Sequence, residues 1–229
     1  MINEEMLKAA KVIPVITKDC VLKEDALKEC ITKGGFPLVL KKPDVEMDLA
    51  GIRYGILKDN GTFEMEGQEF PVSSYSSCSL QEAEKILKKD PDAVIVSDGI
   101  FEESIDAMAV RAFYRHVYDI CLKHVGMNEE EGNGPASAQA AADLFRDGVV
   151  NTGISWFGSP LVEVMYAERS KGVKGHIGIG VNDVYHAMLY YEMLGYHFRR
   201  ETEVKDDAGL KLIYFDLEVN GFAVHLVRK

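Results

Sequence analysis

Four ionisable side chains in the second half of the chain have the types and the spacing of a metal site. His124 and His176 are the second residues of KHVGMN and GHIGIG, two segments that align as His-apolar-Gly-apolar. Glu163 and His225 are the third residues of LVEVM and AVHLV, which also align. Three imidazoles and one carboxylate suit a divalent transition metal, because such ions bind nitrogen and oxygen donors. The repeat predicts one shared site and does not distinguish among zinc, nickel, iron, manganese and cobalt.

Strand alternation gives these polar residues a functional interpretation. Successive side chains of a strand point to opposite faces, so both strand-opening histidines share a face with glycines that leave open volume beside the imidazole. Glu163 and His225 interrupt apolar strands, and a buried carboxylate is costly unless it is protonated, paired or metal-bound. Each residue taken alone could also be an ordinary hydrogen-bonded core residue. The remaining histidines have no partner in the repeat, and solvated or capping roles suffice for them: His116, His186 and His197.

Hydrophobic periodicity places the four candidate ligands on two successive series of elements. The first series contains the strand KHVGMN, the helix PASAQAAADLFRD, the strands GISWFG and LVEVM, and a further short strand near 148–151. The second contains the strand HIGIGV, the helix DVYHAMLYYEMLG and the strands HFRRETEV, LKLIYFDLE and FAVHLVRK. Both series therefore have the order β-α-β-β-β, with the candidate ligands on the first and last strand of each.

The first half of the chain predicts a separate, smaller α/β domain of undetermined topology. It opens with strands in KVIPVIT and FPLVLKK around a helix in KEDALKECITKGG. The pair Asn60-Gly61 is a strong hairpin signal, Ser79 with Glu82 forms a capping box, and EESIDAMAVRAFYRH predicts a helix. We therefore expect an α+β protein with domains at 1–115 and 116–229.

The composition excludes several classes of partner. The net charge is −11 and the pI about 5.1, and no cluster of Lys or Arg offsets them, so nucleic acid and anionic membranes are poor partners. No signal-peptide pattern and no apolar stretch of roughly 18 residues is present, which predicts a cytoplasmic location. The four cysteines form no CxxC pair and predict reduced, buried thiols. A small-molecule metabolite is the expected partner.

Residues from about 117 to 229 resemble a known superfamily. The doubled β-α-β-β-β order, the openings KHVGMN and GHIGIGVNDVYHAMLYYEMLGY and the closing strand LVEVM are similar to vicinal oxygen chelate proteins, which include glyoxalase I, extradiol dioxygenases and fosfomycin-resistance proteins. The resemblance implies a curved cup formed by the two units, with the metal held by their first and last strands. It places His124, Glu163 and His176 at ligand positions, whereas His225 departs from the family, whose last strand usually offers a carboxylate.

The resemblance also implies a chemistry. Members of the superfamily chelate a substrate through two neighbouring oxygens, and their metal stabilises an enolate-like state. Glu163 is then the one aligned carboxylate that could act as a catalytic base. Four protein ligands would close a tetrahedral shell and make the site structural, whereas a five- or six-coordinate metal keeps positions for substrate oxygens.

Residues from about 11 to 105 are similar to 2-keto-3-deoxy-6-phosphogluconate aldolases, some of whose bacterial members carry a similar C-terminal tail. The likeness lies in the first β-α-β and in SCSLQEAEKILKKDPDAVIVSDGIFEESI. FPLVLKK lacks the Glu of the aldolase pattern, and no later strand presents a Schiff-base lysine in a comparable setting. About 115 residues also fall short of the roughly 200 that an eightfold barrel needs. A diverged aldolase fragment is therefore expected.

These observations predict a divalent-metal-binding, glyoxalase-like protein that binds or acts on a small oxygen-rich metabolite, as a lyase or isomerase if it is catalytic. One alternative is a non-catalytic ligand-binding or assembly module, because no nucleophile, phosphate-binding loop or second aligned carboxylate is present. Another is an aldolase-related protein without the catalytic Glu and Lys. Because the superfamily often pairs subunits, a homodimer joined at an edge strand such as LKLIYFDLE is also expected.

Overall fold

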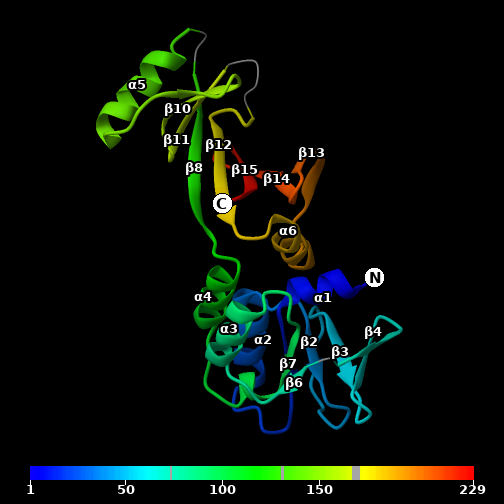
Figure 1. Cartoon of the computed structure of the whole chain (residues 1–229). Helices are drawn as coiled ribbons and strands as arrows, with labels where there is room; N and C mark the ends of the chain where they lie inside the picture. The colour runs from blue at the N-terminus through cyan, green and yellow to red at the C-terminus, as the bar shows by residue number, and fades with distance from the viewer. Residues whose placement is uncertain (73, 130–131, 167–170) are drawn as a thin grey trace. The chain divides into compact units, whose positions relative to one another are not determined.

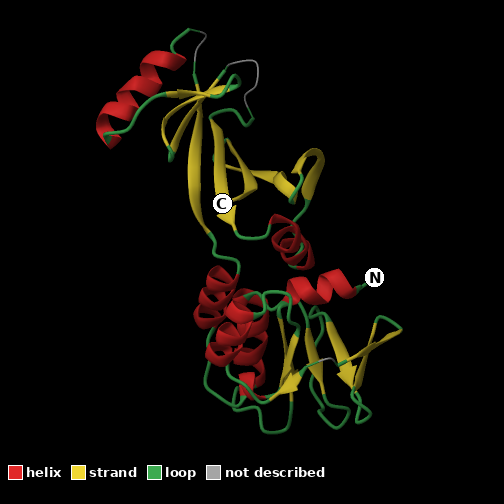
Figure 2. Cartoon of the chain, in the orientation of Figure 1, coloured by secondary structure: helices red, strands yellow, loops and turns green. Residues whose placement is uncertain are grey.

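The computed structural model describes residues 1–72, 74–129, 132–166 and 171–229. The chain divides into two compact units: the first comprises Met1–Tyr118 and Leu189–Gly195, and the second comprises Asp119–Met188 and Tyr196–Lys229. Each unit combines helices with a mixed β-sheet (Figure 2), which confirms the predicted α+β class. Among the helices of these residues, none has the length and apolar character needed to cross a membrane.

The first unit is built on a seven-stranded sheet with the order β5-β4-β3-β2-β1-β7-β6 (Figure 1). Its elements are α1 Glu4–Ala10, β1 Val12–Ile16, α2 Glu24–Gly34, β2 Val39–Lys41, β3 Tyr54–Leu57, β4 Thr62–Met65, β5 Gln68–Pro71, β6 Tyr75–Ser76, α3 Leu80–Lys89, β7 Ile95–Ser97, η1 Gly99–Phe101 and α4 Ala107–Val117. β4 runs antiparallel to both β3 and β5, whereas the other neighbouring strands are parallel. The described part of this sheet is therefore not an eight-stranded parallel barrel.

Two local signals act in the first unit as predicted. β3 and β4 pair antiparallel across the Asn60-Gly61 turn, where Gly61 has a φ of 78° that glycine adopts without strain. The side chain of Ser79 accepts a hydrogen bond from the backbone N–H of Glu82, whose carboxylate accepts one from the backbone N–H of Ser79. This reciprocal pair is the predicted capping box, and α3 begins directly after it.

The helix expected over 102–116 begins later than the sequence suggested. The chain first forms η1, and α4 begins at Ala107. The reason is a local cap: the side chain of Asp106 accepts a hydrogen bond from the backbone N–H of Ala109 at 2.8 Å. An aspartate with extended backbone in this role stabilises a helix that begins after it, so the residues before it leave the helix.

The second unit is an eight-stranded sheet with the order β13-β14-β15-β12-β8-β11-β10-β9. The elements from Asp119 onward are β8 Cys121–Asn128, α5 Gly134–Phe145, β9 Val150–Asn151, β10 Ser155–Ser159, β11 Val162–Met165, β12 Gly175–Val181, α6 Val184–Met193, β13 Phe198–Asp206, β14 Gly209–Val219 and β15 Phe222–Arg228. The part of α6 from Leu189 onward belongs to the first unit. Two successive series thus consist of a strand, a helix and three strands. The short strand expected near 148–151 is β9.

The two series meet at the centre of this sheet. β8 and β12, the first strands of the two series, lie side by side and antiparallel (Figure 1). Each is also parallel to the last strand of its own series, β8 to β11 and β12 to β15. The sheet is strongly curled into a half-barrel, and this curvature lets side chains from four neighbouring strands meet.

The expected edge strand LKLIYFDLE was placed wrongly. It lies in β14, which pairs with β13 on one side and with β15 on the other. A turn after Asp206 leads the chain directly back, so β13 covers the edge that β14 would otherwise expose. β14 therefore has no free edge for a second subunit, and in the described residues the ends of the sheet are β13 and β9.

Candidate metal centre

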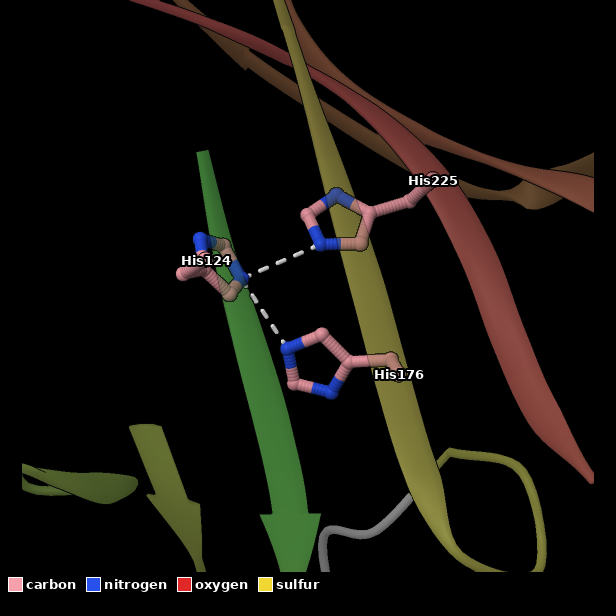
Figure 3. A group of neighbouring side chains, drawn as sticks. All are labelled: His124, His176 and His225. Carbon is pink, nitrogen blue, oxygen red and sulfur yellow. Dashed lines mark hydrogen bonds between the residues drawn. The ribbon is translucent and has the colours of Figure 1, made fainter. Parts of the chain in front are cut away.

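The structure brings together the four side chains that the repeat singled out. Figure 3 shows His124, His176 and His225 projecting from β8, β12 and β15 toward one another. Their ligand atoms all lie within 4.8 Å of one another, close enough to hold a metal ion. Glu163 reaches two of these three histidines from β11. In a flat sheet β11 and β12 would lie about 10 Å apart, since neighbouring strands are about 4.8 Å apart, so the curl of the sheet helps Glu163 of β11 to reach His176 of β12.

Four short separations define the cluster. His124 Nε2 lies 3.0 Å from His176 Nε2 and 3.2 Å from His225 Nε2. The Oε2 atom of Glu163 lies 3.0 Å from His176 Nε2 and 3.3 Å from His124 Nε2. The side chains are almost entirely buried, with 10% of Glu163 and 3% of His176 exposed. Water therefore does not separate these polar atoms.

Hydrogen bonding alone cannot satisfy this cluster. His124 Nε2 has three polar neighbours, but a ring nitrogen carries either one proton or one lone pair. A carboxylate only accepts hydrogen bonds, so no distribution of single protons on Nε2 atoms satisfies every contact. A cation among these atoms would accept all their lone pairs at once. The donor set therefore fits a metal ion better than a hydrogen-bond network.

The separations also have the size that coordination requires. Metal–nitrogen and metal–oxygen bonds of about 2.1 Å place neighbouring ligands about 3.4 Å apart in a tetrahedron and about 3.0 Å apart at adjacent octahedral corners. The four measured values of 3.0, 3.0, 3.2 and 3.3 Å fall within this interval. The three histidines therefore lie close enough together to hold a metal ion, and the separations of Glu163 from two of them have the same size.

Strand register shows that the centre is built twice from the same pattern. Gly126 of β8 is the partner of both Glu163 and His176 on the neighbouring strands. Gly178 of β12 is the partner of both His225 and His124. Each glycine thus lies between two ligands, one from each series. The sequence repeat corresponds to an approximate twofold relation between the two halves of the sheet.

The glycines provide the space that the imidazole rings occupy. A Cβ atom on Gly126 would lie 2.0 Å from Cε1 of His176, and one on Gly178 would lie 2.7 Å from Cε1 of His124. Both distances are far below van der Waals contact, so no larger residue fits without displacing a ring. The two histidine rings lie across the glycines of the neighbouring strand, which directs both Nε2 atoms to the same point.

Burial and mutual proximity favour the protonation states that metal ligands need. Burial, together with the nearby His176 and His124, lowers the pKa of His225 to about 3. Burial also lowers the pKa of His124. Burial alone would raise the pKa of Glu163, but hydrogen bonds from His176 and Ser155 and the nearby imidazoles outweigh it, so this pKa is lowered. Neutral imidazoles and an ionised carboxylate are the forms that coordinate a cation.

Two aromatic side chains that sequence reasoning missed flank the cluster. Phe157 is the strand partner of Glu163, and its ring meets that of His124 edge-on at 5.9 Å. Tyr214 is the strand partner of His225; its ring is tilted by 32° against that of His225 at 4.8 Å and meets that of His176 edge-on at 6.2 Å. The two aromatics occupy corresponding strands of the two series. The alternation of side-chain direction within GISWFG and LKLIYFDLE shows which residues share a face of the strand. It does not show what that face contacts until the strand register is known.

The remaining histidines lie outside the cluster. His186 has a local partner, Asp183, whose Oδ2 lies 2.6 Å from His186 Nδ1. The Asp183 carboxylate also accepts a hydrogen bond from the backbone N–H of His186 at the start of α6. His116 is mostly exposed and lies 3.5 Å from Glu84. His197 is exposed just before β13. Capping and solvated roles were expected for these three residues; the exposed positions of His116 and His197 agree with that, whereas His186 is buried and pairs with Asp183.

Comparison of the chain with protein-family models, with curated proteins and with solved structures found no match.

Proposed function

We propose that the second unit holds a divalent metal in a centre of the vicinal oxygen chelate type and binds a small oxygen-rich metabolite through that metal. His124, Glu163, His176 and His225 are the proposed ligands. The observation that carries the proposal is a cluster in which the ligand atoms of three histidines lie within 4.8 Å of one another and Glu163 contacts two of them, with four separations of 3.0–3.3 Å that single protons cannot satisfy. The doubled strand pattern and its central glycines support the same conclusion.

The side chains around the proposed centre have separable roles. A bound divalent ion would act as a Lewis acid that polarises a carbonyl or hydroxyl oxygen of the metabolite. The three neutral imidazoles supply lone pairs, and Glu163 supplies the negative charge and is the only carboxylate in the cluster, so a base for a lyase or isomerase reaction would have to be this residue. Phe157 and Tyr214 limit the access of water to the ligand atoms.

Metal analysis of the purified protein tests this proposal directly. We expect about one divalent ion per chain after Co²⁺ or Ni²⁺ loading and dialysis, and a loss of affinity of about 100-fold or more in His176→Ala and Glu163→Ala. His197→Ala is the matched control, because it removes an exposed imidazole outside the cluster and should leave the metal content unchanged. A wild-type protein that retains no metal, or ligand variants that retain it fully, would contradict the proposal.

A second candidate is a non-catalytic module in which the metal is structural. The observation that favours it is the combination of four protein donors with nearly complete burial, because four donors can close a tetrahedral shell. The imidazole of His225, in place of the carboxylate expected from the family, also leaves one carboxylate rather than two. The two candidates differ in one measurable property, the access of an outside oxygen ligand to the metal.

A further inference from the structure

The first unit contains a cavity that the proposed metal centre does not use. The cavity has a volume of about 520 Å³ and lies between α1, the β4–β5 hairpin, and α3 with the segment that leads into β7. Its lining includes six apolar side chains: Leu7, Phe63, Phe70, Ile86, Val94 and Val96. Small-molecule sites are typically cavities of about 300–1,000 Å³ with a mostly apolar lining. The cavity therefore has the size and the lining of a ligand site.

Two stacked aromatic rings belong to the inner part of this cavity. Phe63 of β4 and Phe70 of β5 are strand partners, and their ring centroids lie 5.3 Å apart with an angle of 22° between the ring planes. Both side chains are buried, as are Leu7 and Val96, whereas Ile86 is 41% exposed. The apolar body of a ligand would therefore contact aromatic and aliphatic side chains that bulk water scarcely reaches, and burying such surfaces against each other is favourable.

The charged side chains around the cavity give it a negative balance. Glu4, Asp90 and Asp92 line it and are exposed, and among the described residues their carboxylates have no hydrogen bond or ion pair. Lys8 also lines the cavity, but Glu5 Oε1 lies 2.7 Å from its ammonium nitrogen and neutralises it. With Glu5 included, four carboxylates surround one ammonium group. An apolar cavity is thus bordered by acidic groups that lack counter-ions.

This combination favours an organic cation over a neutral or anionic ligand. At a protein surface the attraction between opposite charges is stronger than in bulk water, and the faces of aromatic rings also attract cations. An anion would instead be repelled by the carboxylates. The net charge of −11 on the whole chain acts in the same direction at longer range.

We propose that the first unit binds a small organic amine in this cavity, with the apolar body of the amine against Phe63 and Phe70 and its ammonium group toward the carboxylates of Glu4, Asp90 and Asp92. The inference is independent of the proposed metal centre, because every lining residue of the cavity belongs to the first unit.

Three probes with a phenylethyl body test the proposal in the full chain. At neutral pH, 2-phenylethylamine is a cation, 2-phenylethanol is uncharged and 3-phenylpropionate is an anion. Titrations followed by amide NMR spectra measure the three affinities and locate the site. We expect saturable binding of the amine, about fivefold tighter than that of the alcohol, with shifts of the Leu7, Phe70 and Val96 amides. An amine that binds no tighter than the alcohol or the anion, or that shifts only other amides, would overturn the proposal.

Charge variants test the role of the carboxylates. The double variant Asp90→Asn, Asp92→Asn should bind 2-phenylethylamine about three- to tenfold more weakly than wild type and 2-phenylethanol equally well. Both side chains are exposed, so the fold should be retained. Asp19→Asn, Asp25→Asn is the matched control, because it changes the net charge equally at two exposed positions outside the cavity. An equal loss of amine affinity in this control would show that only the overall charge matters.

A blocking variant tests the position of the site. Ile86→Trp places a larger side chain in the cavity lining and should abolish saturable binding of both the amine and the alcohol. Met108→Trp is its control, since Met108 is an exposed residue of α4 outside the lining. Undiminished binding in Ile86→Trp, or an equal loss in Met108→Trp, would contradict binding in this cavity. None of these outcomes affects the metal centre, which metal analysis tests separately.

Discussion

At the scale of single residues, the balance between burial and charge decides the properties of the cluster. In this nearly dry site the imidazole of His225 lies beside those of His124 and His176, and burial and these two neighbours disfavour a proton on it more than the negative charge of Glu163 favours one. Burial adds a cost for every charged form. The outcome is clearest for His225, whose pKa falls to about 3 from an ordinary value of 6.5. The metal-free cluster therefore keeps His225 neutral at physiological pH.

This shift predicts a pH-dependent stability of the metal-free protein. Below pH 6.5 the unfolded chain binds a proton at His225 that the folded chain does not bind until about pH 3, so the free energy of unfolding falls as the pH falls through this window. When the pH is lowered from about 7 to about 5, we expect the free energy of unfolding of His225→Gln to fall by about 1–2 kcal/mol less than that of wild type. Urea unfolding in the presence of a chelator measures this.

The matched variant for this experiment is His197→Gln. His197 is exposed and outside the cluster, so its substitution should leave the wild-type pH dependence in place. Identical pH dependence in wild type and His225→Gln would show that His225 is readily protonated in the folded state.

At the scale of elements, two glycines in the central strand pair determine whether the ligands can converge. β8 and β12 pair so that each places a glycine opposite a histidine of the other. The ring then lies across the neighbouring backbone instead of standing away from the sheet. The same register places Glu163 and His225 on the outer sides of these glycines. A side chain at either glycine position would therefore disturb two ligands at once.

We expect Gly126→Ala to disrupt the centre. The added methyl would lie 2.0 Å from the His176 ring, which has to move. Metal affinity should fall by more than tenfold, and overpacking should lower the free energy of unfolding by about 1–3 kcal/mol. Gly148→Ala is the control, because a Cβ atom there meets nothing within 4 Å. Metal titration and urea unfolding of both variants measure the effect, and wild-type affinity in Gly126→Ala would contradict the described ring position.

At the scale of the whole molecule, net charge and the closure of the centre govern what the protein can bind. The chain carries a net charge of −11, which disfavours anionic ligands at long range. A neutral bidentate oxygen chelator is therefore the suitable probe for open coordination positions. With the Co²⁺-loaded protein, we expect acetohydroxamic acid to change the visible absorption spectrum in a saturable way if the centre accepts a metabolite. An unchanged spectrum would favour the structural-metal module over the proposed chelate function.

Much of the architecture could be predicted because its determinants are local or repeated. The hairpin at Asn60-Gly61 and the capping box at Ser79 depend on neighbouring residues, and both are confirmed. The start of α4 was missed because Asp106 competes as a cap inside an otherwise helical pattern. The position of β14 was missed because strand order depends on which chain segment covers which edge, and alternation within one strand carries no information about its neighbours.

By itself the sequence determined which side chains correspond: the repeat pairs His124 with His176 and Glu163 with His225, and it marks the glycines beside them. Only the tertiary structure decided that the three histidines meet and that Glu163 reaches two of them, because this requires the register of β8 against β12 and the curl of the sheet. Phe157 and Tyr214 likewise become neighbours of the cluster only through strand pairing. The physical reason is that residue types and hydrophobic periodicity are properties of one segment of the chain. A separation of about 3 Å between atoms on different strands depends instead on the position of every strand between them.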